Sequence, residues 1–269
     1  MSGAVSAQTS LISLSPARNA QSVPRTTAVT ATFDEPLSLE AAPQQALKIF
    51  STQSTRKQAA TTTVSGNTIK LTPGSGAGFK PGETISATIT TAVQGSSGQN
   101  LAKPQVFQFI AATSPSTGTF NGDSELTVGN NTTNATLGDI DGDGDLDLLT
   151  ANYNNKGTVT VRLNNGKGAF SGNQEVAVGP GPYQVVLGDV DGDGDLDLLT
   201  PNANTTINTV SVRLNDGKGT FGGTQEVKVG ENPHAVALGD VDGDGDLDLL
   251  AANYTDSSSN YATSTVSVR

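Results

Sequence analysis

Hydrophobic and polar residues alternate in short runs along the first part of the chain. Val29, Ala31 and Phe33 alternate with threonines. The same period of two recurs in residues 68–72, 84–90 and 107–109. Successive side chains of a β-strand point to opposite faces, so this period indicates strands buried on one face. Gly, Pro and Asn residues separate the runs, which favours an antiparallel β-sandwich over residues 11–112, with room for a helical turn only in residues 37–46.

The second part of the chain, residues 118–269, repeats one pattern three times after a linker at residues 113–117. Phe120, Phe170 and Phe221 occupy the same repeat position and lie 50 and 51 residues apart. Self-similarity at such a period is typical of repeat architectures, so we expect each copy to form the same unit. The middle copy predicts four strands, at residues 183–190, 196–202, 209–215 and 225–229.

Two adjacent leucines stand at the same place in each copy. They are Leu148-Leu149, Leu198-Leu199 and Leu249-Leu250. Adjacent side chains on a strand point to opposite faces, so we expect both faces of this strand to be buried. Four-stranded sheets that stack face to face meet this condition, and they are the blades of a β-propeller. The predicted fold class is therefore all-β, with a β-sandwich followed by three propeller-type blades.

The third copy stops before its fourth strand, and residues 125–129 form a spare copy of that strand ahead of the first unit. Propellers have about four to eight blades, so three blades predict a fragment of a longer propeller. Alternatively, the spare strand completes another unit in the same or a neighbouring chain. Open blade edges expose unpaired backbone and apolar faces, which predicts self-association.

Each copy contains nine residues with five aspartates, beginning with Asp139-Ile-Asp-Gly-Asp-Gly-Asp-Leu-Asp147. A hard cation removes the repulsion among so many carboxylates, and calcium accepts about six to eight oxygen ligands in a flexible geometry. The sequence therefore predicts three Ca²⁺ sites, with Asp145 and its counterparts offering main-chain carbonyls. The expected metal-binding residues are Asp139, Asp141, Asp143, Asp145 and Asp147; Asp189, Asp191, Asp193, Asp195 and Asp197; and Asp240, Asp242, Asp244, Asp246 and Asp248.

These loops differ from EF-hand loops, because Thr150, Thr200 and Ala251 stand where an EF-hand has its bidentate Glu. The Asp at loop position nine must then complete the coordination, and a strand must follow it. Magnesium is an alternative ion, although it prefers retained waters and a small octahedron. A solvated acidic turn is the alternative without a metal.

Composition narrows the functional classes. The chain has 269 residues and no cysteine, which excludes disulfides and thiolate metal sites. It has 26 acidic against 15 basic residues, and this balance does not suggest the basic surface that nucleic-acid binding needs. Fifteen of the acids lie in the three loops, and three Ca²⁺ ions would change the net charge from −11 to −5. No apolar run is long enough to predict a membrane span, and a signal peptide is absent or already removed. Because extracellular calcium fills even weak sites, we expect an extracellular or cell-surface location.

Both parts resemble known families. The turn-and-strand segments Ser15–Pro24, Ala28–Leu37, Ile69–Pro73, Pro81–Ile85 and Phe107–Phe109 resemble the bacterial Ig-like domains of S-layer and other surface proteins. Such domains usually act as spacers or stalks. The Gly138–Asp147 and Gly118–Gly122 segments and their copies resemble the FG-GAP/VCBS repeats of integrin-α-like β-propellers. That resemblance implies one calcium per Asp-rich loop, held between two strands of a blade.

We therefore expect a non-enzymatic calcium-binding scaffold or adhesion module, whose partner is a cell-surface protein or a glycan. His234 is the single histidine, and no nucleophile elbow, zinc cluster or phosphate loop accompanies it. The alternative is a carbohydrate-binding accessory propeller of a larger secreted protein or enzyme. Its candidate ligand-binding residues are Tyr153 and Tyr254, which recur at one repeat position; packing between blades is the other explanation for them. Arg162, Arg213 and Arg269 also recur, and we expect them to form hydrogen bonds between blades.

Overall fold

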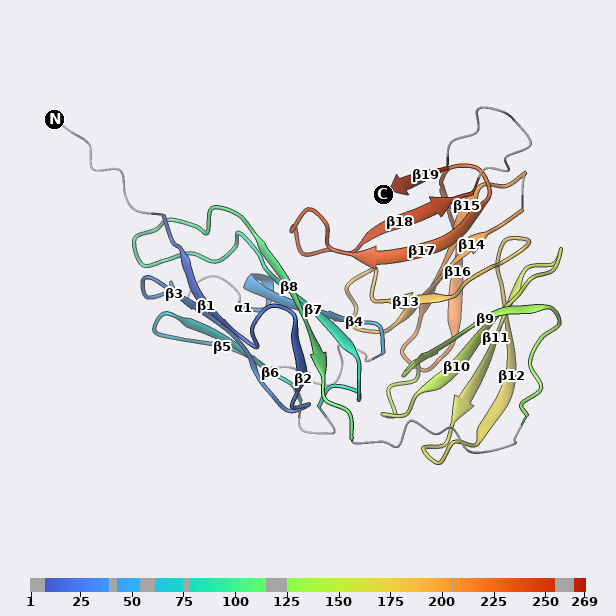
Figure 1. Cartoon of the computed structure of the whole chain (residues 1–269), viewed down its shortest axis with the longest axis horizontal. Coiled ribbons are helices and arrows are strands. Elements are labelled where there is room, and N and C mark those ends of the chain that lie inside the picture. The colour runs from blue at the N-terminus through green and yellow to red at the C-terminus, as the bar shows by residue number, and fades with distance from the viewer. Residues whose placement is uncertain are drawn as a thin grey trace. The chain divides into compact units, whose positions relative to one another are not determined.

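A computed structural model of the chain describes residues 8–38, 43–53, 61–74, 78–114, 125–204, 206–254 and 264–269. Most of the predicted linker, together with Phe120 and its flanking glycines, lies outside these residues. The chain divides into two compact units, one consisting mainly of residues before Ser114 and the other mainly of residues after it. Its regular secondary structure consists of β-strands and one short helix (Figure 1). None of the described helices has the length and apolar composition needed to cross a bilayer.

The first unit consists of two four-stranded sheets, with strand orders β1-β3-β6-β5 and β2-β8-β7-β4. The strands are β1 (Leu11–Ser15), β2 (Ala20–Val23), β3 (Val29–Phe33), β4 (Leu47–Ser51), β5 (Thr61–Ser65), β6 (Thr68–Thr72), β7 (Thr84–Ile89) and β8 (Gln105–Ala111). Neighbouring strands pair antiparallel except β2 and β8, which are parallel. The single turn of helix α1 (Pro43–Ala46) lies within the segment where a helical turn was expected.

The core of this unit follows the period of two in the sequence. In β3, the burial of Val29, Ala31 and Phe33 alternates with that of the intervening threonines, which are more exposed. Ile69 and Ile85 supply buried side chains from one sheet and the other. The two sheets therefore enclose one apolar layer, as an Ig-like sandwich requires.

The second unit contains three successive sheets, one for each sequence repeat (Figure 1). The first consists of β9 (Thr132–Gly138), β10 (Asp147–Asn152), β11 (Thr158–Asn164) and β12 (Phe170–Ala177). The second consists of β13 (Val186–Gly188), β14 (Asp197–Asn202), β15 (Thr209–Asn215) and β16 (Phe221–Lys228). The third consists of β17 (Pro233–Gly239), β18 (Asp248–Asn253) and β19 (Thr265–Val268). All pairs within these sheets are antiparallel.

The middle sheet packs on both of its neighbours. Leu198 belongs to a core shared with the first sheet, whereas the adjacent Leu199 belongs to a core shared with the third sheet. Both side chains are at most 2% exposed, which confirms that the two faces of this strand are covered. In the first and third repeats one leucine of the pair, Leu149 or Leu249, is buried and the other is only partly buried.

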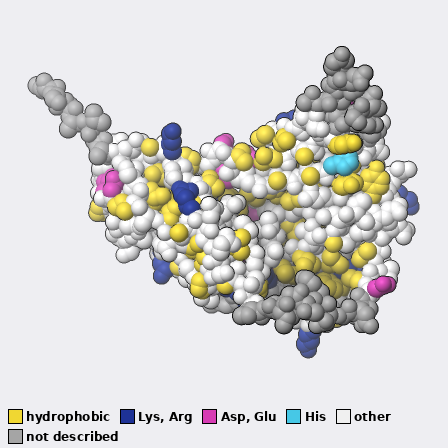
Figure 2. Space-filling model, viewed as in Figure 1, with side chains coloured by type: hydrophobic (Ala, Val, Ile, Leu, Met, Phe, Trp, Pro, Cys, Tyr) yellow, Lys and Arg dark blue, Asp and Glu magenta, His cyan; other side chains and the backbone are white. Residues whose placement is uncertain are grey.

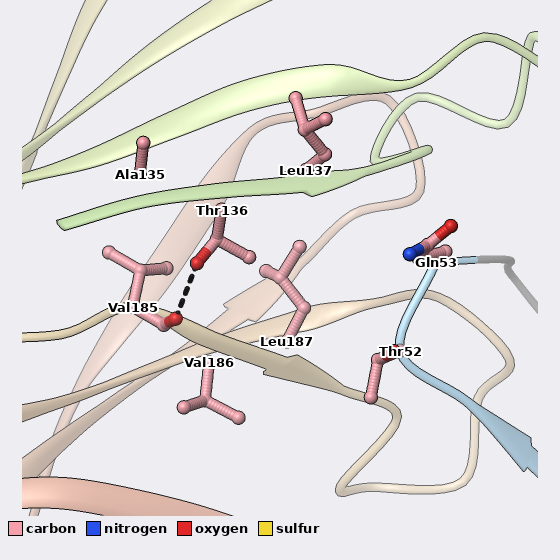
Figure 3. A pocket seen from close by; sticks show the side chains of 8 residues that line it. All are labelled: Thr52, Gln53, Ala135, Thr136, Leu137, Val185, Val186 and Leu187. Carbon is pink, nitrogen blue, oxygen red and sulfur yellow. Dashed lines mark hydrogen bonds between the residues drawn. The ribbon is translucent and has the colours of Figure 1, made fainter. Parts of the chain in front are cut away.

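Hydrogen bonds also join neighbouring sheets. At the seam between the first two, the Thr136 hydroxyl donates to the Val185 carbonyl at 2.7 Å (Figure 3). The Arg213 side chain donates to the Ala177 carbonyl at 2.8 Å, and Arg269 donates to the Lys228 carbonyl at 3.1 Å. Each of these arginines thus bonds to the last strand of the preceding repeat, as the sequence predicted.

The first and last segments of the second unit differ from a complete repeat. Among the described residues the third sheet has three strands. Residues 125–129, expected to form a spare strand, are not in a strand. Among the described residues no neighbouring strand forms backbone hydrogen bonds with this segment, and a β-strand requires such a partner. Within the same residues no sheet closes into a ring, and the propeller therefore remains a prediction.

Candidate metal centre

The three Asp-rich loops occupy equivalent places in the three sheets. They connect β9 to β10, β13 to β14, and β17 to β18. In each hairpin the last Asp of the loop faces a glycine on the preceding strand, in the pairs Asp147↔Gly138, Asp197↔Gly188 and Asp248↔Gly239. The sheet register therefore fixes where each loop begins and ends.

Glycine and aspartate together determine how each loop bends. Gly142 and Gly144 have φ values of +74° and +98°, which side chains with a Cβ rarely adopt. The same two positions have positive φ in the other loops. Between the glycines, the Asp141 carboxylate accepts the Asp143 N–H at 3.1 Å, and the Asp143 carboxylate accepts the Asp145 N–H at 2.9 Å. These local bonds hold alternate residues in a tight curve.

This curve brings three of the five carboxylates in each loop together. In each group, one carboxylate oxygen from every residue lies within 4.8 Å of the others. The groups are Asp139, Asp141 and Asp147; Asp189, Asp191 and Asp197; and Asp240, Asp242 and Asp248. The aspartates at loop positions five and seven, such as Asp143 and Asp145, are not part of these groups. The Asp145 side chain instead lies against Gly166 in the turn after β11.

The ninth-position aspartates of the first two loops are fully buried. The Asp147 carboxylate accepts backbone N–H groups of Ile140 and Asn164 at 3.0 and 2.8 Å. Asp197 accepts those of Val190 and Asn215 at 3.0 and 2.9 Å. These bonds join the loop to the third strand of its own sheet, so each carboxylate has a fixed position.

Burial also shifts the pKa of these carboxyls. It raises the pKa of Asp147 to about 6, with a smaller contribution from the charges of Asp141 and Asp143. It raises the pKa of Asp197 to about 6 in the same way, with contributions from Asp191 and Asp189. Burial is likewise the main cause of the raised pKa of Asp141. A bound cation would reverse this penalty, because it favours the ionised carboxylate.

The spacing of the oxygens is compatible with a hard cation. Two oxygens on one Ca²⁺, each about 2.3–2.6 Å from it, are at most about 5.2 Å apart, and two on one Mg²⁺, with bonds of about 2.0–2.1 Å, are at most about 4.2 Å apart. Separations below 4.8 Å therefore suit calcium over the whole range and magnesium over part of it. The donor set is all oxygen, as a hard cation requires. Three carboxylates leave further coordination positions, which loop carbonyls such as that of Asp145 and water would fill.

The structure also places the two tyrosines expected from the sequence. Tyr153 is 42% exposed and Tyr254 is 52% exposed. They lie at the two ends of a row of rings, which we call the aromatic row: Tyr153, Tyr183, His234 and Tyr254. Successive ring centroids are 6.2, 4.6 and 5.3 Å apart. Figure 2 shows the single histidine with hydrophobic side chains around it.

Tyr183 and His234 were not identified as members of a site from the sequence. A signal for them exists, since each follows a proline at the same repeat position, in Pro182-Tyr183 and Pro233-His234. The rings meet at interplanar angles of 55–89°, so the row offers separate ring faces and edges instead of one flat platform. His234 Nδ1 lies 2.9 Å from the carbonyl oxygen of Asn232, which can only accept, so Nδ1 carries the proton of this bond.

Comparisons with known proteins agree with the sequence motifs. A bacterial Ig-like domain family matches residues 5–111, and an FG-GAP-like repeat family matches residues 139–200 and 203–251. No curated protein matches the chain. Two solved structures align with most of the chain. An L,D-transpeptidase from Mycobacterium smegmatis is 15% identical, with coverage of 80% of this chain and 79% of that chain and a TM-score of 0.28. The LD transpeptidase LdtMt1 in complex with imipenem is 14% identical, with coverage of 78% of each chain and a TM-score of 0.27. The family matches confirm the architecture expected from the motifs: the chain consists of an N-terminal bacterial Ig-like domain followed by FG-GAP-like repeats.

Proposed function

We propose that the chain is a non-enzymatic, calcium-stabilised scaffold or adhesion module that works outside the cell. The observation that supports this most strongly is the recurrence of one three-carboxylate group at the same place in three sheets. A single acidic turn is common on protein surfaces, whereas the same three-carboxylate group at the same place in three sheets is explained if each group binds the same ligand. Ig-like and FG-GAP domains are typical of extracellular proteins, which supports the location.

Calcium would act as a structural staple in each repeat. The three carboxylates come from both ends of a loop, so one ion would tie the end of one strand to the start of the next. The chain has no cysteine, and disulfides are therefore not available for this task. At a free calcium concentration a hundred times the dissociation constant, each site would add about 2.7 kcal/mol to the free energy of unfolding.

The repeats would serve as the blades of a propeller-type array, with the Ig-like domain as a spacer. Two observations support the blade arrangement: the middle sheet is buried on both faces, and hydrogen bonds connect each sheet to the next. In this proposal the carboxylate groups bind metal. No chemical reaction is therefore assigned to the chain.

Calorimetric titration with Ca²⁺ tests the metal sites. We expect three ions to bind per chain, and we expect Asp191→Ala to lower this number to two, because it removes one carboxylate of the middle group. Asp216→Asn is a matched control, since Asp216 lies in a turn where the first repeat has Asn165. That variant should bind three ions. Three ions bound by Asp191→Ala would contradict the ligand assignment.

A second candidate function, glycan binding, is supported by the aromatic row. Its three tyrosines are each at least 40% exposed, and exposed aromatic faces are the surfaces on which sugar rings stack. A glycan array probed in calcium and in EDTA tests this. Binding that is lost in Tyr254→Ala but retained in Ile207→Ala, whose side chain is 37% exposed outside the row, would support the row as a sugar site. The absence of any glycan hit would leave the tyrosines with packing between repeats.

A further inference from the structure

One buried side chain joins the first Asp-rich loop to the second. Asn215 is the last residue of β15 in the second repeat, and it is 5% exposed. Its backbone N–H donates to the Asp197 carboxylate at 2.9 Å, and its Nδ2 donates to the Leu196 carbonyl at 3.0 Å. Both of these bonds stay within the second repeat. The same Nδ2 also donates to the Ile140 carbonyl at 2.8 Å, and Ile140 lies in the first loop.

Ile140 in turn contacts the first carboxylate group. Its backbone N–H donates to the Asp147 carboxylate at 3.0 Å, and it directly follows Asp139 in the chain. Asp139 and Asp147 are both members of that group. A continuous path of three hydrogen bonds thus connects Asp197 of the second group with Asp147 of the first. Every residue on this path is at most 5% exposed, so water does not compete for these bonds.

The turn that follows Asn215 also packs beside the first loop. A Cβ added to Gly219 would lie 3.5 Å from the Ile140 side chain and 3.7 Å from the Asp141 side chain. Asp141 is the third member of the first carboxylate group. The first loop is therefore bounded by a turn of the second repeat as well as by its own sheet.

The equivalent residue of the first repeat has only local bonds. Asn164 is the last residue of β11, and it donates its backbone N–H to Asp147 at 2.8 Å and its Nδ2 to the Leu146 carbonyl at 3.0 Å. Both partners belong to its own repeat, and among the described residues its side chain bonds to no other repeat. A Cβ added to Gly168, in the turn after β11, would meet nothing within 4 Å. Asn164 thus matches Asn215 in its own repeat without a link to a second loop.

We propose that Asn215 is a positioning residue that couples calcium binding at the first two loops, so that occupation of either loop raises the affinity of the other. This inference rests on the calcium sites proposed above. When the second group is occupied, Asp197 is fixed, and with it the Asn215 amide that holds the Ile140 carbonyl. The first loop is then closer to its binding conformation before its own ion arrives, so less ordering opposes binding.

Thermodynamic linkage sets the form of the coupling. If occupation of the second loop raises the affinity of the first by some factor, occupation of the first raises that of the second by the same factor. Coupling between sites usually changes an affinity about 5- to 150-fold. A single hydrogen bond joins the two loops, so we expect a coupling factor at the low end of this range, about fivefold.

Calcium titration of the whole chain, with single groups removed, measures this factor. Asp141, Asp191 and Asp242 occupy the same loop position, and each belongs to one group. Asp242→Ala leaves the first two groups. Adding Asp191→Ala leaves the first group alone, and adding Asp141→Ala instead leaves the second group alone. The product of the two stepwise association constants in the Asp242→Ala chain should exceed the product of the two single-group constants about fivefold.

Two further variants, each made in the same three backgrounds, assign the coupling to one side chain. Asn215→Ala removes the amide but keeps the backbone N–H that holds Asp197, so the two loops should become independent. Asn164→Ala is the matched control. It should weaken binding to the first group, because it removes a local bond, but it should retain the coupling factor. A purely structural role of Asn215 would lower the individual affinities and leave the factor unchanged.

Hydrogen exchange gives a second readout that needs no change at Asn215. In the chain with both Asp141→Ala and Asp242→Ala, calcium can occupy only the second group. We expect calcium to slow amide exchange in the peptide that covers residues 139–147, because the bond to Ile140 transmits the order of the second loop. Exchange in the first loop that does not respond to calcium would overturn the proposal.

The outcomes distinguish this coupling from the calcium sites themselves. Two ions that bind independently in the Asp242→Ala chain would leave the sites in place and overturn the coupling. A coupling factor that persists in Asn215→Ala would overturn the assignment to Asn215. Fewer than two ions bound by the Asp242→Ala chain would contradict the proposed function, and the coupling would fall with it.

Discussion

Asp147 and Asp197 combine a fixed position with an electrostatic cost. Each carboxylate accepts two backbone N–H groups, which defines its position, and each is fully buried, which penalises its charge. Burial therefore raises the pKa of each carboxyl to about 6. A neutral amide would avoid this cost, but it could accept only one of the two bonds, because its NH₂ group cannot accept. The arrangement is explained if a cation compensates the charge.

The raised pKa values predict how the calcium-free protein responds to pH. The folded state holds these protons up to about pH 6, whereas the unfolded chain releases them near the usual pKa of 3.8. The free energy of unfolding should therefore fall as pH rises from about 4 to about 6. For each carboxyl, the change from 3.8 to about 6 corresponds to about 3 kcal/mol. Urea unfolding of calcium-free protein at a series of pH values measures this slope.

The double variant Asp147→Asn with Asp197→Asn is the control for this slope. An amide does not titrate, so the variant should show a smaller decrease over the same pH range. Its absolute stability is not the readout, because an amide oxygen can accept bonds but its NH₂ group cannot. With calcium present the trend should reverse, since protons compete with the ion below about pH 6. Identical slopes in the variant and the parent chain would contradict the assignment.

At the level of elements, β14 is the strand that connects the repeats. All six of its residues are buried, and its two leucines face different cores. Because successive side chains point to opposite faces, one strand can belong to two interfaces at once. The stacking of the repeats thus depends on a pair of adjacent residues in the middle copy.

Truncating either leucine should therefore cost about the same. We expect Leu198→Ala and Leu199→Ala each to lower the free energy of unfolding of the repeats by about 2–5 kcal/mol, because each leaves a cavity in a packed core. Leu214→Ala is the matched control, since Leu214 is 38% exposed on the neighbouring strand, and it should cost much less. Chemical denaturation curves give the comparison. A negligible loss in one of the two core variants would show that only one face of β14 is packed.

At the level of the whole molecule, much of the organisation is evident from the sequence. The period of two in β3 and β6, the repeat of the Asp-rich loops and the adjacent leucines are local patterns, and the strands that they predict are present. The families expected from the motifs were confirmed. These features are predictable because each follows from residues that are near one another in the chain.

Other features depend on how distant residues meet. Four carboxylates and the Asp145 carbonyl were expected at the metal of the first loop; the curve of the backbone brings three of the carboxylates within 4.8 Å of one another, and the Asp145 side chain lies toward the turn at Gly166. The aromatic row likewise forms only when three repeats are stacked, since Tyr183 and His234 are 51 residues apart. Neither result follows from spacing alone.

Differential scanning calorimetry of the whole chain, in calcium and after its removal with EDTA, tests the central claim most directly. The Asp-rich loops lie in the sequence repeats, and the Ig-like domain has its own core. We therefore predict that EDTA lowers the melting temperature of the repeats and leaves the transition of the Ig-like domain where it was. Superimposable curves in calcium and EDTA would contradict the claim that bound cations hold the three hairpins together.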